Sequence, residues 1–434
     1  MSNPEASAPG CTLEGRQQAE KLNLECQCST LDETKLRAEL AGSAEAEELH
    51  RMLVAERPYL FAPTPVFMPS ACLSLQARII AAIERVAALP EYQGRVLTHA
   101  PQVAGFVPQA AGAFLGYDFH LGINGPKLIE INTNAGGALL NAMLPRVHSV
   151  CCEPYPALQG GAIRAGAPVE QSFVDMFRTE WRLERGDARL GRIAIVDDEP
   201  REQFLYPEFL LFRDLFRSHG IEAEIADAGQ LTFRDGALWL EDRRIDLVYN
   251  RLTDFSLSQK SHRQLLEAYL ARAAVVTPHP RAHAVYADKR NLALLTDEQA
   301  LADLGVDATT RALLQAGIAH TEVISEVSAE RYWSERRKLF FKPAAGFGSK
   351  AAYRGDKLTR RVFQEILKSD YVAQELVLPS ERSVTVGGEA VRLKVDIRNF
   401  VYQAQVQSVA SRLYQGQTTN LRTPGGGFAP VVVV

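Results

Sequence analysis

The chain contains no run of about 18 apolar residues, which is the length that a membrane-spanning helix requires. Its first ten residues, MSNPEASAPG, lack the basic stretch followed by an apolar stretch that marks a secretory signal. The formal net charge of −4 offers no excess of positive charge for nonspecific binding to nucleic acid. These absences predict a cytoplasmic protein that binds neither membranes nor nucleic acid.

Cysteine is also scarce in this sequence. The six cysteines among 434 residues are unevenly spaced, at positions 11, 26, 28, 72, 151 and 152. This usage argues against a disulfide scaffold. The chain also lacks a persuasive Ser-His-Asp or Cys-His combination, so the sequence gives no reason to expect a covalent nucleophile.

The length suffices for two or three domains of roughly 100–200 residues each. Residues 31–57 are rich in Ala, Leu and Glu and predict a helix, with Thr30 and Glu33 as a capping box. Further along, RIAIVDD, a helical stretch over 203–219 and EAEIAD form a strand–helix–strand pattern, which predicts an α/β domain with parallel strands. We therefore divide the chain into four parts: 1–50, a mobile segment and helix; 51–189; 190–280, the α/β domain; and 281–434.

Two predicted strands over 114–132, joined by an Asn-Gly turn, carry acidic residues on both arms. Glu130 and Asn132 are two residues apart, so they share one face of their strand, and Ile129 faces the other way. Asp118 lies on the partner arm. Converging Asp, Glu and Asn oxygens suit a hard cation, and we expect Mg²⁺ with nucleotide phosphates.

A second block of motifs begins at Lys342, which ends a predicted strand and enters the loop PAAGFGSK. Gly346 and Gly348 let backbone N–H groups approach phosphate oxygens, with Ser349 beside them and lysines supplying positive charge. Because Lys342 precedes the glycines, the loop differs from a P-loop, in which the lysine follows them. The loop is therefore a candidate phosphate site of another type.

The C-terminal part of the sequence carries two candidate arginines. Arg398 and Arg412 lie on the two arms of a predicted hairpin, and the guanidinium group donates paired hydrogen bonds to a phosphoryl group. Asn420 follows, and the glycine run at 425–427 predicts a loop that closes over the substrate. A single arginine is more often a surface charge, so this assignment depends on the whole set of motifs.

The order and content of these motifs resemble the ATP-grasp superfamily, in its circularly permuted branch typified by eukaryotic-type glutathione synthetase. The segments that carry the resemblance are KLIEINTNAGG, RIDLVYNRLTDF, FKPAAGFGSK, YVAQELV and ASRLYQGQTTNLRTPGGG. In other ATP-grasp ligases the lysine–glycine block precedes the Asp…Glu-x-Asn block, and here the order is reversed. The resemblance implies a mixed α/β (α+β) ATP-grasp fold, circularly permuted, with the 190–280 domain inserted.

The resemblance also implies a reaction and its site residues. ATP would phosphorylate a small-molecule carboxylate, and an amine would then attack the acyl phosphate to form an amide. ATP-binding residues would be Lys289, Lys342, Gly346, Gly348 and Ser349, together with Gln374, Glu375 and Val377 of the adenine hinge. Magnesium would lie on Asp118, Glu130 and Asn132. Catalysis would fall to Arg412 and Arg398, and substrate binding to Arg251, Asn134 and Asn420. A homodimer is also implied.

Two departures from the glutathione synthetase pattern leave the substrate open. The acidic magnesium ligand of the family's glycine-rich loop is replaced in the neighbourhood of Ala345 and Gly346. The serines that hold the peptide substrate are replaced by Asn134, Ala135 and Gly136. We therefore keep three readings: a carboxylate–amine ligase with an unknown substrate, an ATP-grasp small-molecule kinase, and a non-catalytic nucleotide-binding protein.

Overall fold

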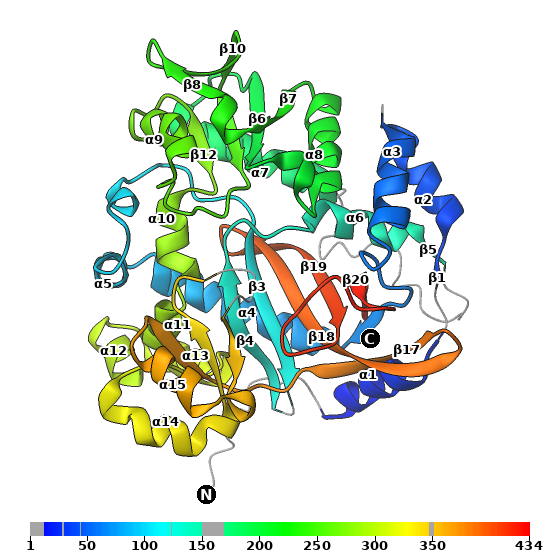
Figure 1. Ribbon diagram of the computed structural model, residues 1–434, viewed down its shortest axis with the longest axis vertical. Helices are drawn as coiled ribbons and strands as arrows, with labels where there is room; N and C mark the ends of the chain where they lie inside the picture. The colour runs from blue at the N-terminus through cyan, green and yellow to red at the C-terminus, as the bar shows by residue number, and fades with distance from the viewer. Residues whose placement is uncertain (1–12, 28–29, 44, 123, 150–168, 347–350) are drawn as a thin grey trace, which may run out of the picture.

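The protein is described by a computed structural model covering residues 13–27, 30–43, 45–122, 124–149, 169–346 and 351–434. Three sheets form its framework (Figure 1). The central sheet has six strands, in the order β20 (Gly427–Ala429), β19 (Gln405–Tyr414), β18 (Glu389–Tyr402), β3 (Leu115–Gly122) and β4 (Gly125–Asn132), with β17 (Ser380–Val386) also paired to β18. Two segments 280 residues apart in sequence are therefore neighbours in one sheet.

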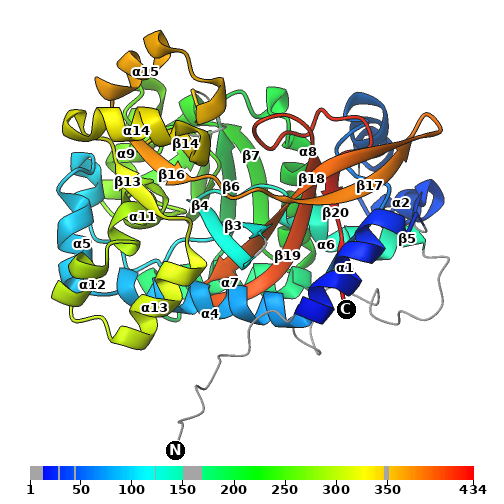
Figure 2. The same ribbon diagram turned by 90° about the horizontal axis from the view of Figure 1, so that it is seen from below.

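The outer sheet has four strands and lies beside β4 (Figure 2). Its order is β13 (Thr321–Val323), β16 (Tyr371–Glu375), β14 (Leu339–Pro343) and β15 (Tyr353–Arg354), and every pairing is antiparallel. The surrounding helices are α11 (Arg290–Leu295), α12 (Glu298–Asp303), α13 (Ala308–Gly317), α14 (Ala329–Glu335) and α15 (Arg360–Leu367). A bridge between Leu128 and Ile318 joins this part of the chain to β4.

Residues 192–277 form the parallel sheet, as the strand–helix–strand pattern predicts. Its order is β12 (Val275–Thr277), β11 (Leu247–Asn250), β6 (Arg192–Asp197) and β7 (Glu222–Asp227). The helices of this part are α7 (Val169–Arg185), α8 (Tyr206–Ser218), α9 (Arg263–Leu270) and α10 (Pro280–Ala282). A three-stranded meander, β8 (Leu231–Arg234), β9 (Ala237–Leu240) and β10 (Arg243–Ile245), carries the predicted Asp-Gly turn, with positive φ at both Asp235 and Gly236.

The remaining elements lie mainly toward the two ends of the chain. They are α1 (Leu13–Glu25), α2 (Glu33–Leu40), α3 (Ala46–Arg51), α4 (Ser70–Ala87), α5 (Pro90–Leu97) and α6 (Ala138–Val147), with the two-stranded pairs β1 (Thr30–Leu31) with β5 (His148–Ser149) and β2 (Val66–Met68) with β21 (Val431–Val433). The single helix predicted over 31–57 is wrong, because α2 ends at Leu40 and a new helix begins at Ala46. The predicted capping box is also wrong, since Asp32 is the N-cap of α2 and accepts from Lys35 N at 3.1 Å.

Successive side chains along the strands of the central sheet point to opposite faces, and here one face is apolar and the other polar. The apolar face packs with Ile79 and Ile83 of α4 in one buried cluster, through Tyr117, Phe119, Val395, Ile397 and Leu413. Positions of the opposite parity carry polar groups: Asp118, His120, Asp396, Arg398, Arg412 and Tyr414. The sequence pattern that makes these strands amphipathic therefore also gathers the candidate site residues on one face.

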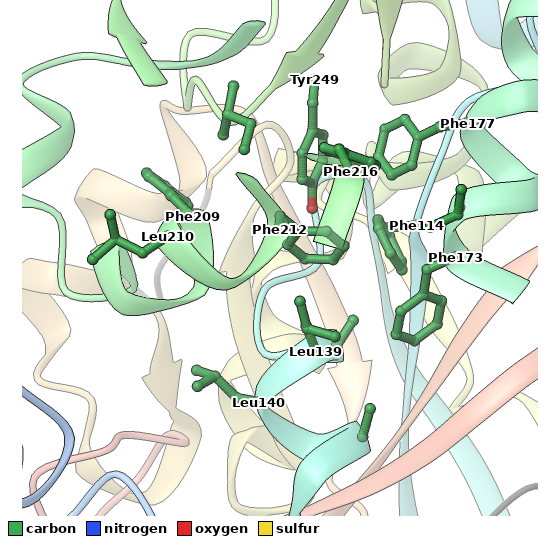
Figure 3. Packing of buried hydrophobic residues seen from close by; sticks show 14 of the residues in the cluster. Phe114, Leu139, Leu140, Phe173, Phe177, Phe209, Leu210, Phe212, Phe216 and Tyr249 are labelled. Atoms are coloured by element: carbon green, nitrogen blue, oxygen red, sulfur yellow. The ribbon is translucent and has the colours of Figure 1, made fainter. Parts of the chain in front are cut away.

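A buried aromatic cluster joins the parallel sheet to the central sheet (Figure 3). Phe212 of α8 lies at its middle, with its ring centroid 5.5 Å from Phe114, 5.3 Å from Tyr249 and 5.9 Å from Phe216. Phe114 directly precedes β3 and is completely buried. Packing of these rings, edge-to-face between Phe212 and both Phe114 and Tyr249, therefore fixes the parallel sheet against the segment that leads into the site strand.

Two further findings bear on the predicted cellular setting. Among the residues described, no helix combines the length and apolar character that crossing a membrane requires. Cys72 is disulfide-bonded, whereas Cys26 is free. Neither finding decides the cellular location, which stays a prediction.

Candidate functional site

A cleft lies between the polar face of the central sheet and the outer sheet. Its walls come from β3, β4 and β19 on one side and from β14, β16 and the segment after β16 on the other. The lining residues are His120, Ile129, Glu130, Lys289, Phe340, Lys342, Pro343, Gly346, Ala352, Gln374, Glu375, Leu376, Val377, Tyr414, Gln417, Thr418 and Thr419. Three blocks that are distant in sequence thus line one cavity, including six of the predicted nucleotide residues: Lys289, Lys342, Gly346, Gln374, Glu375 and Val377.

Lys342 lies on β14 at the centre of this cleft. Its Nζ donates to Ile129 O at 2.9 Å and to Gln374 Oε1 at 2.8 Å. Burial disfavours the ammonium form and lowers the pKa of Lys342 to about 8, helped by the positive charge of Lys289 and opposed by Glu130. At neutral pH the group is still mostly protonated, so it presents a poorly solvated positive charge that an anion would stabilise.

Lys289, which directly precedes α11, approaches the same space from another direction. Its Nζ donates to Gly346 O at 2.7 Å and lies 3.1 Å from Glu130 Oε1. Its backbone N–H donates to Ala344 O at 3.0 Å, which ties the start of the helix to the loop after β14. Lys289 therefore connects the glycine-rich loop with the strand that carries Glu130. The predicted residues Gly348 and Ser349 lie outside the described part of the chain.

The predicted hinge occupies the end of β16 and the residues after it. Gln374 is buried, accepts from Lys342 and donates to Thr321 Oγ1 at 3.1 Å. Glu375 is more exposed, with Lys127 Nζ 3.7 Å from its Oε2. Val377 O accepts a hydrogen bond from His120 Nδ1 at 2.8 Å, which fixes that ring nitrogen as the donor. The hinge is thus held to both sheets and leaves its backbone along one edge of the cleft.

Asp118 and Arg398 form a bidentate ion pair next to this cleft. Arg398 is directly opposite Asp118 in the β18–β3 register and donates from Nε to Oδ1 at 2.7 Å and from Nη2 to Oδ2 at 2.6 Å. Arg412 Nη2 adds a bond to Oδ2 at 2.9 Å. Burial alone would raise the pKa of Asp118, but the two guanidinium groups outweigh it and lower the pKa to about 2. Asp118 is therefore a carboxylate held between two arginines.

The hydrogen bonds of the acids decide which of them can hold a cation. Asp118 Oδ2 also accepts from Asn132 Nδ2 at 3.0 Å, so three donors crowd Oδ2 and one meets Oδ1, and two of the groups involved are cationic guanidinium groups. Glu130 engages Lys289 through Oε1, and Asn132 uses only its amide nitrogen in this network. Within the described ranges, no three His, Cys, Asp or Glu side chains lie close enough to hold a metal ion. Glu130 and Asn132 each keep a side-chain oxygen that could meet a Mg²⁺ shared with phosphates, whereas Asp118 is flanked by two guanidinium groups whose charge disfavours a cation there.

Arg251 lies at the end of β11, on the far side of the 134–137 segment. It is 6% exposed, its Nη1 donates to Tyr249 Oη at 3.0 Å, and its Nη2 lies 4.0 Å from Glu208 Oε2. Its Nε is buried without a hydrogen-bond acceptor among the described residues. A Cβ at Gly136 would approach Arg251 Nη2 to 2.9 Å, so the glycine leaves room for the guanidinium. The structure therefore places Arg251 beside the residues that follow β4.

The two predicted asparagine contacts have local partners. Asn134 has φ of 63° and donates from Nδ2 to Leu252 O at 3.2 Å, while its Oδ1 is buried without a donor in the described residues. Asn420 accepts from Arg422 N and from Thr423 Oγ1, both at 3.0 Å. Asn420 thus braces the loop after β19, and Asn134 keeps one oxygen for a further partner. Neither arrangement tests the predicted role in substrate binding.

Asp197, at the end of β6, carries a buried carboxyl group. We expect this group to make the stability of the folded protein depend on pH. Burial raises its pKa to about 7, against the opposing charge of Arg251. Between about pH 4 and pH 7 the folded state keeps a proton that the unfolded state has lost, so stability falls as pH rises and levels off above pH 7. Asp197→Asn should abolish this fall and, by about 1.4 kcal/mol per pKa unit, stabilise the protein at pH 8 by up to about 4 kcal/mol.

The measurement is the melting temperature of the variant minus that of the wild type, taken from pH 5 to pH 8. The difference should grow with pH. The control is Asp235→Asn at the exposed turn between β8 and β9, which should give a flat difference. A flat difference for Asp197→Asn as well would show that this carboxyl is already ionised at pH 5.

Sequence reasoning missed three residues that the structure places at the site. Asp396 accepts from Arg412 Nε at 2.7 Å and from Nη2 at 2.9 Å, and Thr419 Oγ1 donates to its Oδ2. His120 lies between Val377 O and Tyr414 Oη. Strand parity gives the signal that could have found two of them, since Asp396 is two residues from Arg398 and His120 is two residues from Asp118, whereas Thr419 lies in a loop.

The strand β4 contains a bulge that the alternation rule does not foresee. Asp118 pairs with Glu130, whereas Phe119 pairs with Leu128, so Ile129 is the extra residue. Ile129 therefore lines the cleft and accepts from Lys342, contrary to the prediction that it faces the core. Ile131 does face the core.

Comparison with known proteins identifies the fold. No protein-family model and no curated protein matches the chain. The fold is similar to that of a glutathione synthetase-like effector from Globodera pallida, with a TM-score of 0.57, 9% identity, and coverage of 92% of this chain and 98% of that one. A putative gamma-glutamylcysteine synthetase from Methylobacillus flagellatus is 12% identical over 83% of this chain and 86% of its own, with a TM-score of 0.47. The first likeness confirms a glutathione synthetase-like α/β fold, and at such identity it shows the fold alone.

Proposed function

We propose that the cleft binds ATP and that the protein is an ATP-dependent carboxylate–amine ligase. The observation that carries this proposal is the convergence of Lys289, Lys342 and the hinge after β16 on one cavity, with two arginines adjoining it. The lysine ammonium groups suit the phosphates of a nucleotide, and the backbone after β16 suits its adenine ring. The glutathione synthetase-like fold supports the same conclusion.

The residues have roles that follow from their positions. Lys289 and Lys342 bind the phosphates, and the backbone around Val377 borders the adenine. Phosphoryl transfer depends on alignment and charge neutralisation more than on a covalent enzyme group. Arg412, with Arg398, stabilises charge on the phosphoryl group as it passes to a carboxylate oxygen. Glu130 and Asn132 would hold Mg²⁺, which neutralises phosphate charge when bound.

Two chemical steps complete the proposed reaction. The substrate carboxylate attacks the terminal phosphorus, which gives an acyl phosphate and ADP. An amine then attacks the acyl carbon, which forms the amide and releases phosphate. Arg251 and Asn134, which lie together on the far side of β4, are the proposed contacts for the acid substrate.

ADP release against a matrix of carboxylic acids and amines tests this function. A ligase forms ADP only when an acid and its amine are both present. ADP formed with a single hydroxyl compound would instead identify a small-molecule kinase. An amine-dependent signal that also survives in Lys342→Ala would contradict the assignment of the cleft.

One observation favours a second candidate, a nucleotide-binding protein without catalysis. Asp118, Asp396 and Glu130 are all paired with cations, and Gly346 stands in the neighbourhood where the family's loop has an acidic magnesium ligand. This candidate predicts ATP binding with no ADP release across the matrix. A homodimer, implied by the family resemblance, stays a prediction for either candidate.

A further inference from the structure

Two buried acids, Asp118 and Asp396, are bonded to the arginines beside the cleft. The oxygens of Asp118 accept hydrogen bonds from Arg398, Arg412 and Asn132. Those of Asp396 accept from Arg412 and Thr419. Asp118 is 2% exposed and Asp396 is fully buried, so water does not replace these bonds. Both oxygens of each carboxylate accept from an arginine, so each acid fixes the orientation of a guanidinium group.

The arginines are held side by side by this arrangement. Both present Nη2 to the same oxygen, Asp118 Oδ2, at 2.6 Å for Arg398 and 2.9 Å for Arg412. Each also uses Nε on a carboxylate, so two of its three nitrogens are fixed. In the described part of the chain, the Nη1 amino group of neither arginine has a hydrogen-bond acceptor. Each arginine thus keeps one amino group for an anion.

We propose that Asp118 and Asp396 are positioning residues that orient Arg398 and Arg412 toward one anionic group, a phosphate or acyl phosphate, and that neither binds a cation. Gly116 supports the placement, because a Cβ there would lie 3.4 Å from Arg398 Nε and 2.6 Å from Ala135 Cβ. Thr419 extends the network into the loop after β19, which lines the cleft. The proposal deepens the proposed function and rests on it for the identity of the anion.

Because Asp118 is negatively charged, the two hypotheses predict opposite changes in anion affinity when it is replaced by asparagine. Asp118→Asn removes a negative charge near the anion, which by Coulomb's law alone should strengthen anion binding. If Asp118 instead orients the arginines, the variant should weaken binding by about tenfold, the loss expected for a misaligned charge-assisted hydrogen bond. A cation ligand would behave differently again, since its loss should matter only when a divalent metal is present.

The experiment titrates inorganic pyrophosphate into the full chain by calorimetry, once in EDTA and once with Mn²⁺. We expect Asp118→Asn to weaken binding about equally in both conditions, by about tenfold. Unchanged or tighter binding in EDTA, with weakening confined to Mn²⁺, would overturn the proposal. Glu130→Gln provides the contrast, because it should weaken binding only with Mn²⁺.

A second variant covers the case in which Asp118→Asn fails to fold. Asp396→Asn changes only the acid that holds Arg412, and should also weaken pyrophosphate binding in EDTA; unchanged binding would contradict the proposal. ATP is titrated in parallel to separate the two hypotheses. Pyrophosphate binding without ATP binding would refute the nucleotide cleft and leave the arginine site standing. A wild-type protein that binds neither would refute both.

Discussion

Lys342→Ala should weaken ATP binding by about 30- to 100-fold, the loss expected when one buried charge-assisted contact to phosphate is removed. Its ammonium group lies between the bulge of β4 and the hinge strand and donates to Ile129 O and Gln374 Oε1. Alanine removes the charge and leaves Gln374 Oε1 without this donor. Equilibrium titration with a fluorescent ATP analogue measures the effect.

The control for Lys342→Ala is Lys368→Ala. Lys368 is exposed and follows α15, outside the cleft, so its removal changes the net charge equally without touching the site. ATP affinity should then stay within about twofold of the wild type, because exposed charges are screened by salt. Equal losses in the two variants would mean that ATP responds to overall charge, and the cleft assignment would fail.

Phe212→Ala should destabilise the folded protein by about 3–5 kcal/mol, the range for removing a buried aromatic ring from a packed core. The ring is fully buried and contacts Phe114, Phe173, Phe177, Phe216 and Tyr249. The cavity would open between α8, α7 and the start of β3. The melting temperature measures this destabilisation and should fall sharply. ATP affinity measured at low temperature should change little.

The matched control is Phe204→Ala, which removes the same side chain from a surface position. Phe204 is 38% exposed, and its ring lies beside the Arg57 guanidinium. Its loss should cost at most about 1 kcal/mol, the value for an exposed cation–π contact. If Phe212→Ala were no more destabilising than Phe204→Ala, the aromatic cluster would not fix the parallel sheet as described.

Local patterns in the sequence predicted much of the fold. The Asn-Gly and Asp-Gly turns and the alternating strands around them are short-range signals, and they placed β3, β4, β8 and β9 correctly. The helix over 31–57 failed because composition favoured helix throughout while Gly42 and Ser43 interrupt it. A bulge such as that at Ile129 depends on the partner strand, so no single-strand pattern reveals it.

Sequence motifs indicated six residues that line the cleft, but they missed Asp396, Thr419 and His120 and gave none of the connections within the site. The motifs indicated Asp118, Arg398 and Arg412 separately, but their ion pairs join residues 280 and 294 positions apart in the chain. Which acid meets a metal and which meets an arginine follows from strand register, and register is a tertiary property. The pairing of Asp118 with arginines is therefore information that only the three-dimensional structure supplies.

The most direct test of the central claim is a structure of the protein crystallised with a non-hydrolysable ATP analogue. The account predicts the phosphates against Lys289 and Lys342 and the adenine along the backbone at Leu376 and Val377. Nucleotide bound elsewhere, or an empty cleft at saturating analogue with the protein shown to be folded, would contradict it.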